Sequence, residues 1–299
     1  MSEYQDAERR LLAEYGVEAE SRRLRLADPA LDVRVLECGG GDPLVLVHGS
    51  GMSAPTWAPL LAHLRDRRVY AVDLPGFGLS DPYDYSGRPL REHAVAQLTS
   101  LLDALELERV PIAGTSLGGM WAMNLALAQP ERVSSVVSLG IPAVSLPGMK
   151  ADPFFRAMTT PVVRAIARRV PAPPSAAATR RAMRGAMGRA VTDRLPDVYF
   201  EMVRVNMRTP GWKKAMASHL GIALSGGRAR PDCLFSDDEL RAFEVPVLFV
   251  MGDNDVYGPP SVVDRAAALM PDAQVEVLPG GHAPFLDDPE RCAGLIRAR

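Results

Sequence analysis

The sequence predicts an α/β fold in which a doubly wound, mostly parallel sheet carries an inserted helical cap. Short β-branched and apolar runs alternate with segments of helical periodicity in the first 140 residues and again near the end of the chain. Several of these runs are apolar on both faces, as in a sheet that helices cover on both sides. From about residue 141 to residue 236 the alternation stops, and prolines separate helix-like stretches.

The composition is that of a globular protein. Hydrophobic residues make up 47% and charged residues 23% of the chain, and 299 residues suit one large or two small domains. The net charge of −2 argues against a nucleic-acid binder, which is usually strongly basic. The cysteines, Cys38, Cys233 and Cys292, are too few and too far apart for a disulfide framework or a zinc motif. We therefore expect no nucleic-acid partner and no metal.

The chain carries no sequence signal for a membrane or for secretion. No segment approaches the roughly 18 consecutive apolar residues that a membrane helix needs. The N-terminal stretch is charged and lacks the apolar centre of a secretory signal. We therefore expect a cytoplasmic protein without a membrane span.

The order of elements follows from the spacing of apolar residues. In the first 140 residues, strands are predicted at 32–37, 44–47, 69–72, 110–113 and 133–139, and helices at 58–64, 94–105 and 119–129. The first two strands, separated by the turn GGGD at 39–42, are expected to form an antiparallel lead-in. The alternation resumes with a strand at 245–252, a helix at 261–270, a strand at 274–278 and a helix from 289 onwards.

Three regions are predicted along the chain. Residues 1–23 form a helical lead-in, residues 24–140 and 237–299 form the α/β core, and residues 141–236 form a helical cap without strands. A helical insertion between two parallel strands suits a cap over a site at the carboxyl ends of the strands, where open α/β sheets bind their ligands.

The predicted cap is basic and partly amphipathic. Residues 141–235 contain 16 Lys and Arg against 5 Asp and Glu. This excess either attracts an anionic substrate or an acidic membrane surface, or forms a solvated face with internal ion pairs. Val162, Ile166 and Val170, beside arginines, predict an amphipathic helix that lies on the sheet.

A serine flanked by glycines follows the strand predicted at 110–113. The sequence GTSLG at 114–118 matches G-x-S-x-G, in which a sharp strand-to-helix turn presents the serine, here Ser116, from a strained backbone. Small neighbours are needed because a Cβ at Gly114 or Gly118 would collide with the crossing chain. The start of the helix also places a positive dipole beneath Ser116. The alternative is a tight turn that happens to contain a serine.

A second loop of small residues follows the strand predicted at 44–47. The sequence HGSG at 48–51 can bring a backbone N–H, that of Ser50, toward Ser116. Together with the N–H of Leu117, it would form an oxyanion hole with two donors. The alternative is an ordinary glycine turn.

A hydrolytic serine needs a histidine as general base. When the nucleophile comes first, the acid and then the histidine follow it along the chain, which leaves His219 and His282. His282 lies just past the last predicted strand, where a base is expected. His219 lies in the predicted cap and is assigned to the lining of the site or to solvent.

The acid is expected after the preceding strand. The predicted strand at 245–252 leads into GDND at 252–255, which offers Asp253 and Asp255. Asp255 is the better candidate, because the loop must extend a few residues beyond the strand before a side chain reaches His282. Asp253 is expected to bind amides of the loop.

Together these motifs resemble the α/β-hydrolase fold family. The resemblance spans about residues 24–299 and is carried by HGSG at 48–51, DLPGFGLS at 73–80, GTSLG at 114–118, GDND at 252–255 and GH at 281–282. It implies a serine hydrolase with a helical cap. In this family the fourth residue of the G-x-x-D loop is the acid, which favours Asp255. The residue after His-Gly usually supplies an oxyanion N–H, which favours Ser50.

The resemblance also separates subfamilies. Dehalogenases and epoxide hydrolases of this fold have Asp, and dienelactone-type hydrolases have Cys, where this chain has Ser116. Carbon–carbon hydrolases that cut meta-cleavage products typically have Asn two residues before the serine and Trp after the histidine. Here those positions are Gly114 and Ala283. The turn is most similar to that of carboxylesterases and enol-lactone hydrolases.

The predicted function is hydrolysis of a small, apolar carboxylic ester or lactone by Ser116, Asp255 and His282, without a metal or organic cofactor. Residues expected to contact the substrate are Gly51, Met149, Phe154, Trp212 and His219. Alternatives are an acyltransferase, a perhydrolase or a carbon–carbon bond hydrolase with the same residues, or a receptor with slow turnover. The sequence leaves open the substrate, the oligomeric state and the partner of residues 1–23.

Overall fold

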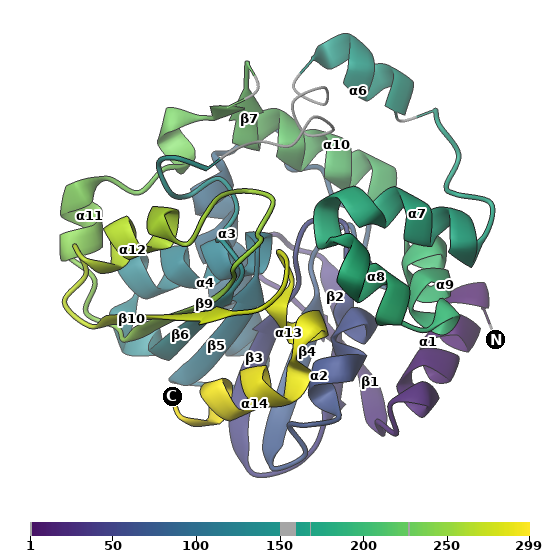
Figure 1. Cartoon of the computed structure of the whole chain (residues 1–299), viewed down its shortest axis with the longest axis horizontal. Coiled ribbons are helices and arrows are strands. Elements are labelled where there is room, and N and C mark those ends of the chain that lie inside the picture. The colour runs from purple at the N-terminus through teal and green to yellow at the C-terminus, as the bar shows by residue number, and fades with distance from the viewer. Residues whose placement is uncertain (1, 150–159, 168, 227) are drawn as a thin grey trace.

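The structure is a computed structural model that describes residues 2–149, 160–167, 169–226 and 228–299. Within these residues the main sheet has eight strands in the order β1-β2-β4-β3-β5-β6-β9-β10 (Figure 1). From β4 onwards every neighbouring pair is parallel, which confirms the predicted fold class. The strands are β1 (Ala19–Arg25), β2 (Asp32–Cys38), β3 (Asp42–Val47), β4 (Arg67–Asp73), β5 (Val110–Thr115), β6 (Val133–Leu139), β9 (Val247–Gly252) and β10 (Ala273–Leu278).

The two strands predicted as an antiparallel lead-in are not neighbours, and that prediction is wrong. β2 pairs antiparallel with β1 and β4, whereas β3 pairs parallel with β4 and β5. The turn at 39–42 therefore joins strands that have β4 between them. Burial is the physical reason: Leu44 and Leu46 face one core and Val45 and Val47 face the other, so β3 belongs in the interior of the sheet.

The N-terminal region is helical only in its first part. α1 (Glu3–Glu14) starts with a capping box between Ser2 and Gln5. Residues 19–23, which the sequence analysis assigns to the helical lead-in, belong to β1. β1 is the edge strand, and its charged side chains are exposed or half-buried, so its sequence lacks the apolar pattern of a buried strand.

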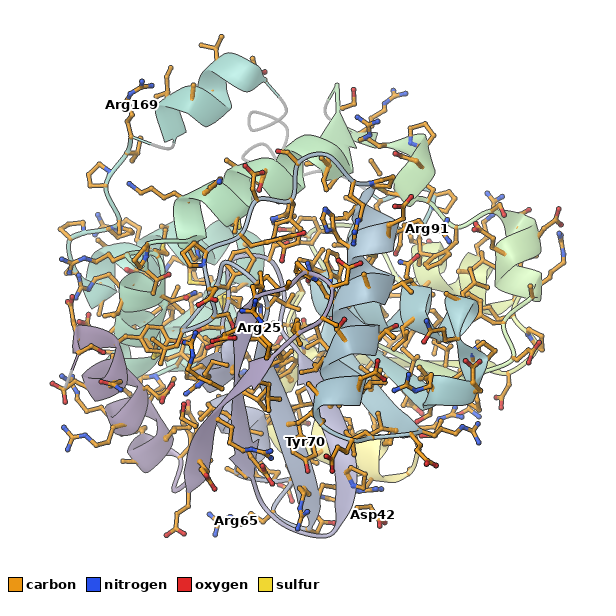
Figure 2. All side chains as sticks on the ribbon, turned by 180° about the vertical axis from the view of Figure 1, so that it is seen from behind. Arg25, Asp42, Arg65, Tyr70, Arg91 and Arg169 are labelled. Carbon is orange, nitrogen blue, oxygen red and sulfur yellow. The ribbon has the colours of Figure 1, made fainter. Side chains whose placement is uncertain are left out.

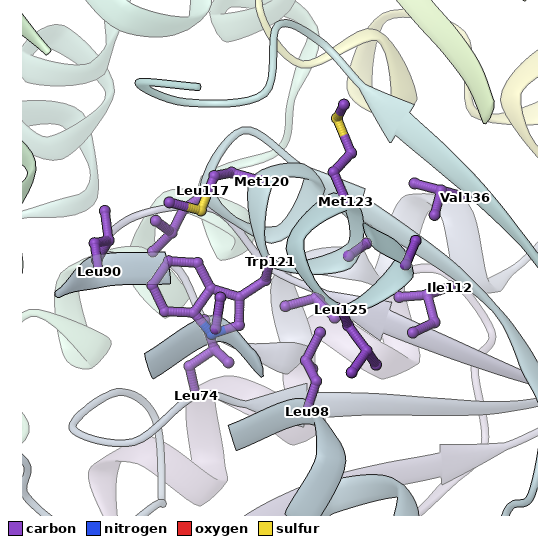
Figure 3. Close-up of a cluster of buried hydrophobic side chains, with 14 of the residues drawn as sticks. Leu74, Leu90, Leu98, Ile112, Leu117, Met120, Trp121, Met123, Leu125 and Val136 are labelled. Atoms are coloured by element: carbon purple, nitrogen blue, oxygen red, sulfur yellow. The ribbon is translucent and has the colours of Figure 1, made fainter. Parts of the chain in front are cut away.

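Helices cover both faces of the sheet. α3, α4 and α12 pack in one core, and α1, α2, α13 and α14 pack in the other. Figure 3 shows the first core, where Trp121 of α4 lies among leucines such as Leu74 and Leu117. These helices are α2 (Ala58–Leu61), α3 (Leu90–Ala104), α4 (Leu117–Ala128), α12 (Ser261–Ala267), α13 (Pro284–Asp287) and α14 (Pro289–Arg297), with short 3₁₀ turns at Ala54–Trp57, Pro130–Arg132 and Pro231–Cys233.

Between β6 and β9 the chain forms a group that we call the inserted helices: α6 (Pro161–Ala167), α7 (Ala176–Met187), α8 (Arg189–Arg194), α9 (Asp197–Asn206) and α10 (Trp212–Ala223). A hairpin of β7 (Leu224–Ser225) and β8 (Arg228–Ala229) follows, so the expectation that this region has no strand is wrong there. α11 (Asp237–Arg241) leads back to the sheet. In Figure 1, α9 lies beside α1 and α6 is outermost. In the described residues, no helix is long and apolar enough to cross a bilayer.

Helix α6 does not lie on the sheet as its sequence predicts. Val162, Ile166 and Val170 are 66%, 57% and 55% exposed. Figure 2, seen from behind, places Arg169 at the outer edge of the molecule. The inner position belongs to α10, whose buried residues join the main core.

Candidate active site

Ser116 stands at a strained turn between β5 and α4. Its φ of 52° and ψ of −110° lie in a region that non-glycine residues rarely occupy. A Cβ at Gly114 would overlap the carbonyl group of Gly118, and a Cβ at Gly118 would overlap the carbonyl oxygen of Val47. The turn is therefore possible only with glycine at both positions, as the sequence pattern predicts.

The loops after β9 and β10 join Asp255 to His282. The Nδ1 atom of His282 lies 2.8 Å from Oδ2 of Asp255, and the other oxygen, Oδ1, accepts the backbone N–H of Tyr257 at 2.9 Å. Because a carboxylate only accepts hydrogen bonds, Nδ1 carries the ring proton and Nε2 of the neutral ring has the lone pair. Nε2 is buried and has no hydrogen-bond partner within the described residues.

One short segment after β6 touches all three residues of the predicted triad. A Cβ at Gly140 would overlap the carbonyl oxygen of His282. The N–H of Ile141 donates to Oδ2 of Asp255 at 3.2 Å, and the N–H of Ala143 donates to the carbonyl oxygen of Ser116 at 3.0 Å. The structure therefore brings the three predicted residues to one place through residues 140–143.

The neighbouring carboxylate has a different role. Oδ1 of Asp253 accepts the N–H of Gly280 at 3.0 Å and the side-chain amide of Asn254 at 2.7 Å. This confirms the expectation that Asp253 binds amides of the loop.

Ser50, Ser116 and Leu117 line a common cavity of about 390 Å³. Most of its wall is apolar, and the described lining residues contain one charged side chain, Arg228 of the β7–β8 hairpin. The apolar lining residues are Ala143, Val144, Leu146, Pro147, Met149, Leu220, Ala223, Leu224, Ala229 and Leu234. The cavity suits the apolar part of a small molecule.

The loop that follows β3, residues 48–52, is held by His48. The backbone N–H of Leu74 donates to Nε2 of His48 at 3.0 Å, so the ring proton is on Nδ1, which donates to the carbonyl oxygen of Gly49 at 2.8 Å. Burial lowers the pKa of His48, which favours the neutral ring that this arrangement requires.

These hydrogen bonds also orient the N–H of Ser50. The carbonyl oxygen of Gly49 accepts a second hydrogen bond, from the N–H of Met52 at 3.1 Å. In a trans peptide the C=O and the following N–H point in opposite directions, so the Ser50 N–H points away from His48 and Met52. Within the described residues no hydrogen bond of this N–H is recorded. As the first residue of α4, Leu117 likewise has no acceptor for its N–H within the helix.

The residues predicted to contact substrate divide into three groups. Met149 and His219 line the cavity. Gly51 and Trp212 do not line it: the indole Nε1 of Trp212 donates to the carbonyl oxygen of Gly51 at 2.8 Å. Gly51 has a φ of 75°, which turns its backbone toward α10. This explains why Gly51 binds Trp212 and does not line the cavity. Phe154 lies outside the described residues.

His219 of α10 contacts the 48–52 loop from the cavity side. Its Nε2 lies 3.0 Å from Oγ of Ser50. Burial lowers the pKa of His219 to about 4, and the backbone carbonyl of Ala215 offsets only part of this effect. The ring is therefore neutral at pH 7 and adds no positive charge to the cavity.

Comparison with known proteins identifies the family of the chain. Residues 44–295 match the Alpha/beta hydrolase family. The chain belongs to this family.

Its relatives have more than one activity. The chain is 39% identical over 140 residues to a 2-hydroxy-6-oxo-2,4-heptadienoate hydrolase of Pseudomonas putida, which covers 43% of this chain and about half of that enzyme, 48%. It is 29% identical over 259 residues to the uncharacterized carboxylesterase nap of Bacillus subtilis, covering 83% and 75% of the two chains. The solved naproxen esterase of Bacillus subtilis has a TM-score of 0.76 at 24% identity over 99% of this chain and 96% of its own.

Three residues of this α/β hydrolase that the sequence analysis did not single out take part in the site. The ring of Tyr257 lies 4.3 Å from that of His282, centroid to centroid, and Tyr257 also lines the cavity. Tyr257 lies two residues after Asp255 in the sequence, and this closeness to a predicted triad residue is a signal by which its role could have been found. Arg228, which lines the cavity, and Asn206, which binds the 48–52 loop, lie between β6 and β9 and belong to no motif.

Several basic residues of the inserted helices form ion pairs. Ion pairs join Arg180 to Asp197, Arg184 to Asp193, Arg194 to Asp287, Arg204 to Glu201 and Glu3, and Arg208 to Glu3. These ion pairs, some of which reach Glu3 and Asp287 outside the inserted helices, neutralise part of the positive charge of this α/β hydrolase, and the interpretation of the remaining charge stays a prediction. In the same residues, no group of three or more His, Cys, Asp or Glu side chains is arranged to hold a metal ion.

Proposed function

We propose that this α/β hydrolase is a serine hydrolase that cleaves a carboxylic ester or lactone through an acyl-enzyme. One observation carries the proposal: His282 is fixed by Asp255 through Nδ1, its Nε2 is buried without a partner in the described residues, and residues 140–143 contact His282, Asp255 and Ser116 together. A base that is oriented on one side and available on the other is what an adjacent serine needs to become a nucleophile.

The proposed reaction is acyl transfer to water. Ser116 Oγ attacks the carbonyl carbon while Nε2 of His282 takes the hydroxyl proton, and Asp255 stabilises the imidazolium that forms. The negative oxygen of the tetrahedral intermediate accepts hydrogen bonds from the N–H groups of Ser50 and Leu117. His282 then protonates the leaving alkoxide, and water attacks the acyl-enzyme in the same way.

The cavity supports a small and mostly apolar substrate. Its volume of about 390 Å³ and its wall of aliphatic side chains suit an acyl chain or a lactone ring of moderate size. In the proposed reaction the nucleophile, the base and the oxyanion donors are all side chains or backbone N–H groups of this chain. Each step therefore has an assigned residue.

The test combines covalent labelling with turnover. A fluorophosphonate probe followed by peptide mapping is expected to modify Ser116, and the chain is expected to hydrolyse p-nitrophenyl acetate or butyrate. Ser116→Ala is expected to abolish labelling and to lower kcat by roughly 10⁶-fold while the protein stays folded. Turnover that survives in Ser116→Ala would contradict the assignment. An absence of both label and turnover in the unmodified chain would favour a receptor.

A second candidate is hydrolysis of a carbon–carbon bond. The identity of 39% to a 2-hydroxy-6-oxo-2,4-heptadienoate hydrolase favours it. Gly114 and Ala283 stand where such enzymes typically have Asn and Trp, which favours ester hydrolysis instead. The same Ser116-dependent assay, run with a 2-hydroxy-6-oxo-dienoate beside the esters, decides between them by the larger kcat/KM.

A further inference from the structure

Two side chains of the inserted helices bind one carbonyl oxygen of the 48–52 loop. The side-chain amide nitrogen of Asn206 and the indole nitrogen of Trp212 each donate to the carbonyl oxygen of Gly51, both at 2.8 Å. A carbonyl oxygen has two lone pairs, so these donors satisfy it completely. Gly51 is adjacent to Ser50, which is proposed to supply an oxyanion N–H.

Hydrogen bonds to both the nitrogen and the oxygen of its side-chain amide fix Asn206 in this position. It is the last residue of α9 and is 0% exposed. While its nitrogen binds Gly51, its oxygen Oδ1 accepts the N–H of Gly78 at 3.0 Å. The amide therefore bridges the 48–52 loop and the loop after β4, and no rotation of the side chain preserves both hydrogen bonds.

Close packing of Gly51 against α10 adds to the hydrogen bonds that hold the 48–52 loop. A Cβ at Gly51 would lie 3.2 Å from Sδ of Met216 and 3.2 Å from Cζ2 of Trp212, so the loop backbone lies directly against α10. With a φ of 75°, Gly51 also occupies a conformation that few other residues adopt. The loop thus depends on the inserted helices for its carbonyl partner and for its packing.

We propose that Asn206 and Trp212 are positioning residues that set the direction of the Ser50 N–H. Binding of the Gly51 carbonyl restrains the peptide plane between Gly51 and Met52, and the Met52 N–H of this same plane donates to the carbonyl oxygen of Gly49 at 3.1 Å. The Gly49 carbonyl, which His48 also binds, shares its peptide plane with the Ser50 N–H, so the restraint reaches this N–H through Met52. The inserted helices then support the oxyanion hole through the 48–52 loop, in addition to the residues of α10 that line the cavity. This inference rests on the proposed function, because it assigns the Ser50 N–H to a tetrahedral intermediate.

The experiment removes the two donors separately and together. Trp212→Phe keeps the ring and loses only the indole N–H, whereas Asn206→Asp keeps the acceptor for Gly78 and loses the donor to Gly51. Each variant is expected to lower kcat about 10- to 100-fold with KM within about threefold, and the double variant to lower kcat further. The affinity of a boronic acid, which places oxygen in the oxyanion hole, should fall with kcat/KM.

Matched controls separate this role from general destabilisation. Trp121→Phe loses an indole hydrogen bond to Gln97 at 3.4 Å, and Asn124→Asp alters a buried amide that donates to the carbonyl oxygen of Met120 at 2.8 Å. In the described residues neither side chain has a hydrogen bond to the 48–52 loop. Both controls should keep kcat within about threefold, even where the melting temperature falls as far as in Trp212→Phe.

Hydrogen exchange provides a readout that needs no substrate. Peptides spanning residues 48–54 should exchange faster in Asn206→Asp and Trp212→Phe and remain unchanged in the two controls. Unchanged exchange in this loop overturns the inference whatever the substrate is. Faster exchange with unchanged kcat, in a chain whose turnover depends on Ser116, overturns it and leaves the proposed function standing. Absence of Ser116-dependent turnover overturns the proposed function and the assignment to an oxyanion hole together.

Discussion

The backbone N–H of Ile141 donates to the same oxygen of Asp255, Oδ2, that is bound by Nδ1 of His282. The other oxygen, Oδ1, accepts the N–H of Tyr257, so both oxygens of the carboxylate are held by backbone groups. Asp255 therefore cannot rotate without losing a hydrogen bond. This fixed carboxylate determines where the imidazole of His282 points, and it links the loop after β6 to the two loops that carry Asp255 and His282.

Replacement of this carboxylate by an amide is expected to reduce catalysis strongly. Asp255→Asn should lower kcat by about 10⁴-fold, because an amide does not hold His282 in the tautomer with the proton on Nδ1 and does not stabilise the imidazolium. Asp253→Asn is the control: its amide oxygen still accepts the N–H of Gly280, and kcat should stay within about tenfold. Steady-state kinetics on one ester measure both. Similar losses in the two variants would contradict the assignment of Asp255.

His48 is expected to act through the 48–52 loop. His48→Ala removes one of the two hydrogen bonds to the carbonyl oxygen of Gly49 and leaves that of the Met52 N–H, so kcat should fall about 10²-fold while KM changes little. His93→Ala is the matched control, because His93 is a buried histidine that binds the carbonyl oxygen of Tyr85 at 2.9 Å, away from the cavity. Both variants should lose about 1–3 kcal/mol of stability. If His93→Ala loses as much kcat as His48→Ala, stability and not loop geometry explains the effect.

Burial of His219 predicts a loss of stability in acid. Its pKa is about 4 in the folded chain, below the ordinary histidine value of 6.5, so the unfolded chain binds more protons between these values. The free energy of unfolding should therefore be unaffected by His219 above pH 6.5 and should fall by up to about 3 kcal/mol as the pH drops to 4. Urea unfolding of the unmodified chain and of His219→Asn at pH 7 and pH 4.5 measures this. The decrease should be smaller in the variant, and equal decreases would show that His219 does not titrate in this way.

Replacement of two glycines by alanine is expected to change the free energy of unfolding in opposite directions. In Gly118→Ala the new Cβ overlaps the backbone oxygen of Val47, which cannot move independently of β3, so the free energy of unfolding should fall by more than about 3 kcal/mol. Gly185, inside α7, has open space where a Cβ would lie. Gly185→Ala should therefore raise the free energy of unfolding by about 0.5–1 kcal/mol. Denaturant titration of both variants tests this. A stable Gly118→Ala would mean that the turn can relax.

The sequence was sufficient for the fold class and for the place of the candidate site. Ser116, Asp255 and His282 each follow a predicted strand, and the carboxyl ends of parallel strands meet at one edge of a sheet. Local patterns also required glycine at 114 and 118, because the turn they form is short and sterically determined. These features depend on residues near one another in the chain, so they can be derived without tertiary structure.

Only the tertiary structure decided the strand order at the N-terminal edge and the partners of the 48–52 loop. β4 lies between β2 and β3 because β3 is buried on both faces. This burial is a property of the assembled sheet and cannot be predicted from the sequence of the turn. Asn206 and Trp212 show the same limit: they lie more than 150 residues from Gly51, and no motif joins them. Hydrogen bonds between distant segments form where packing brings donor and acceptor together, so their residues carry no local signal in the sequence.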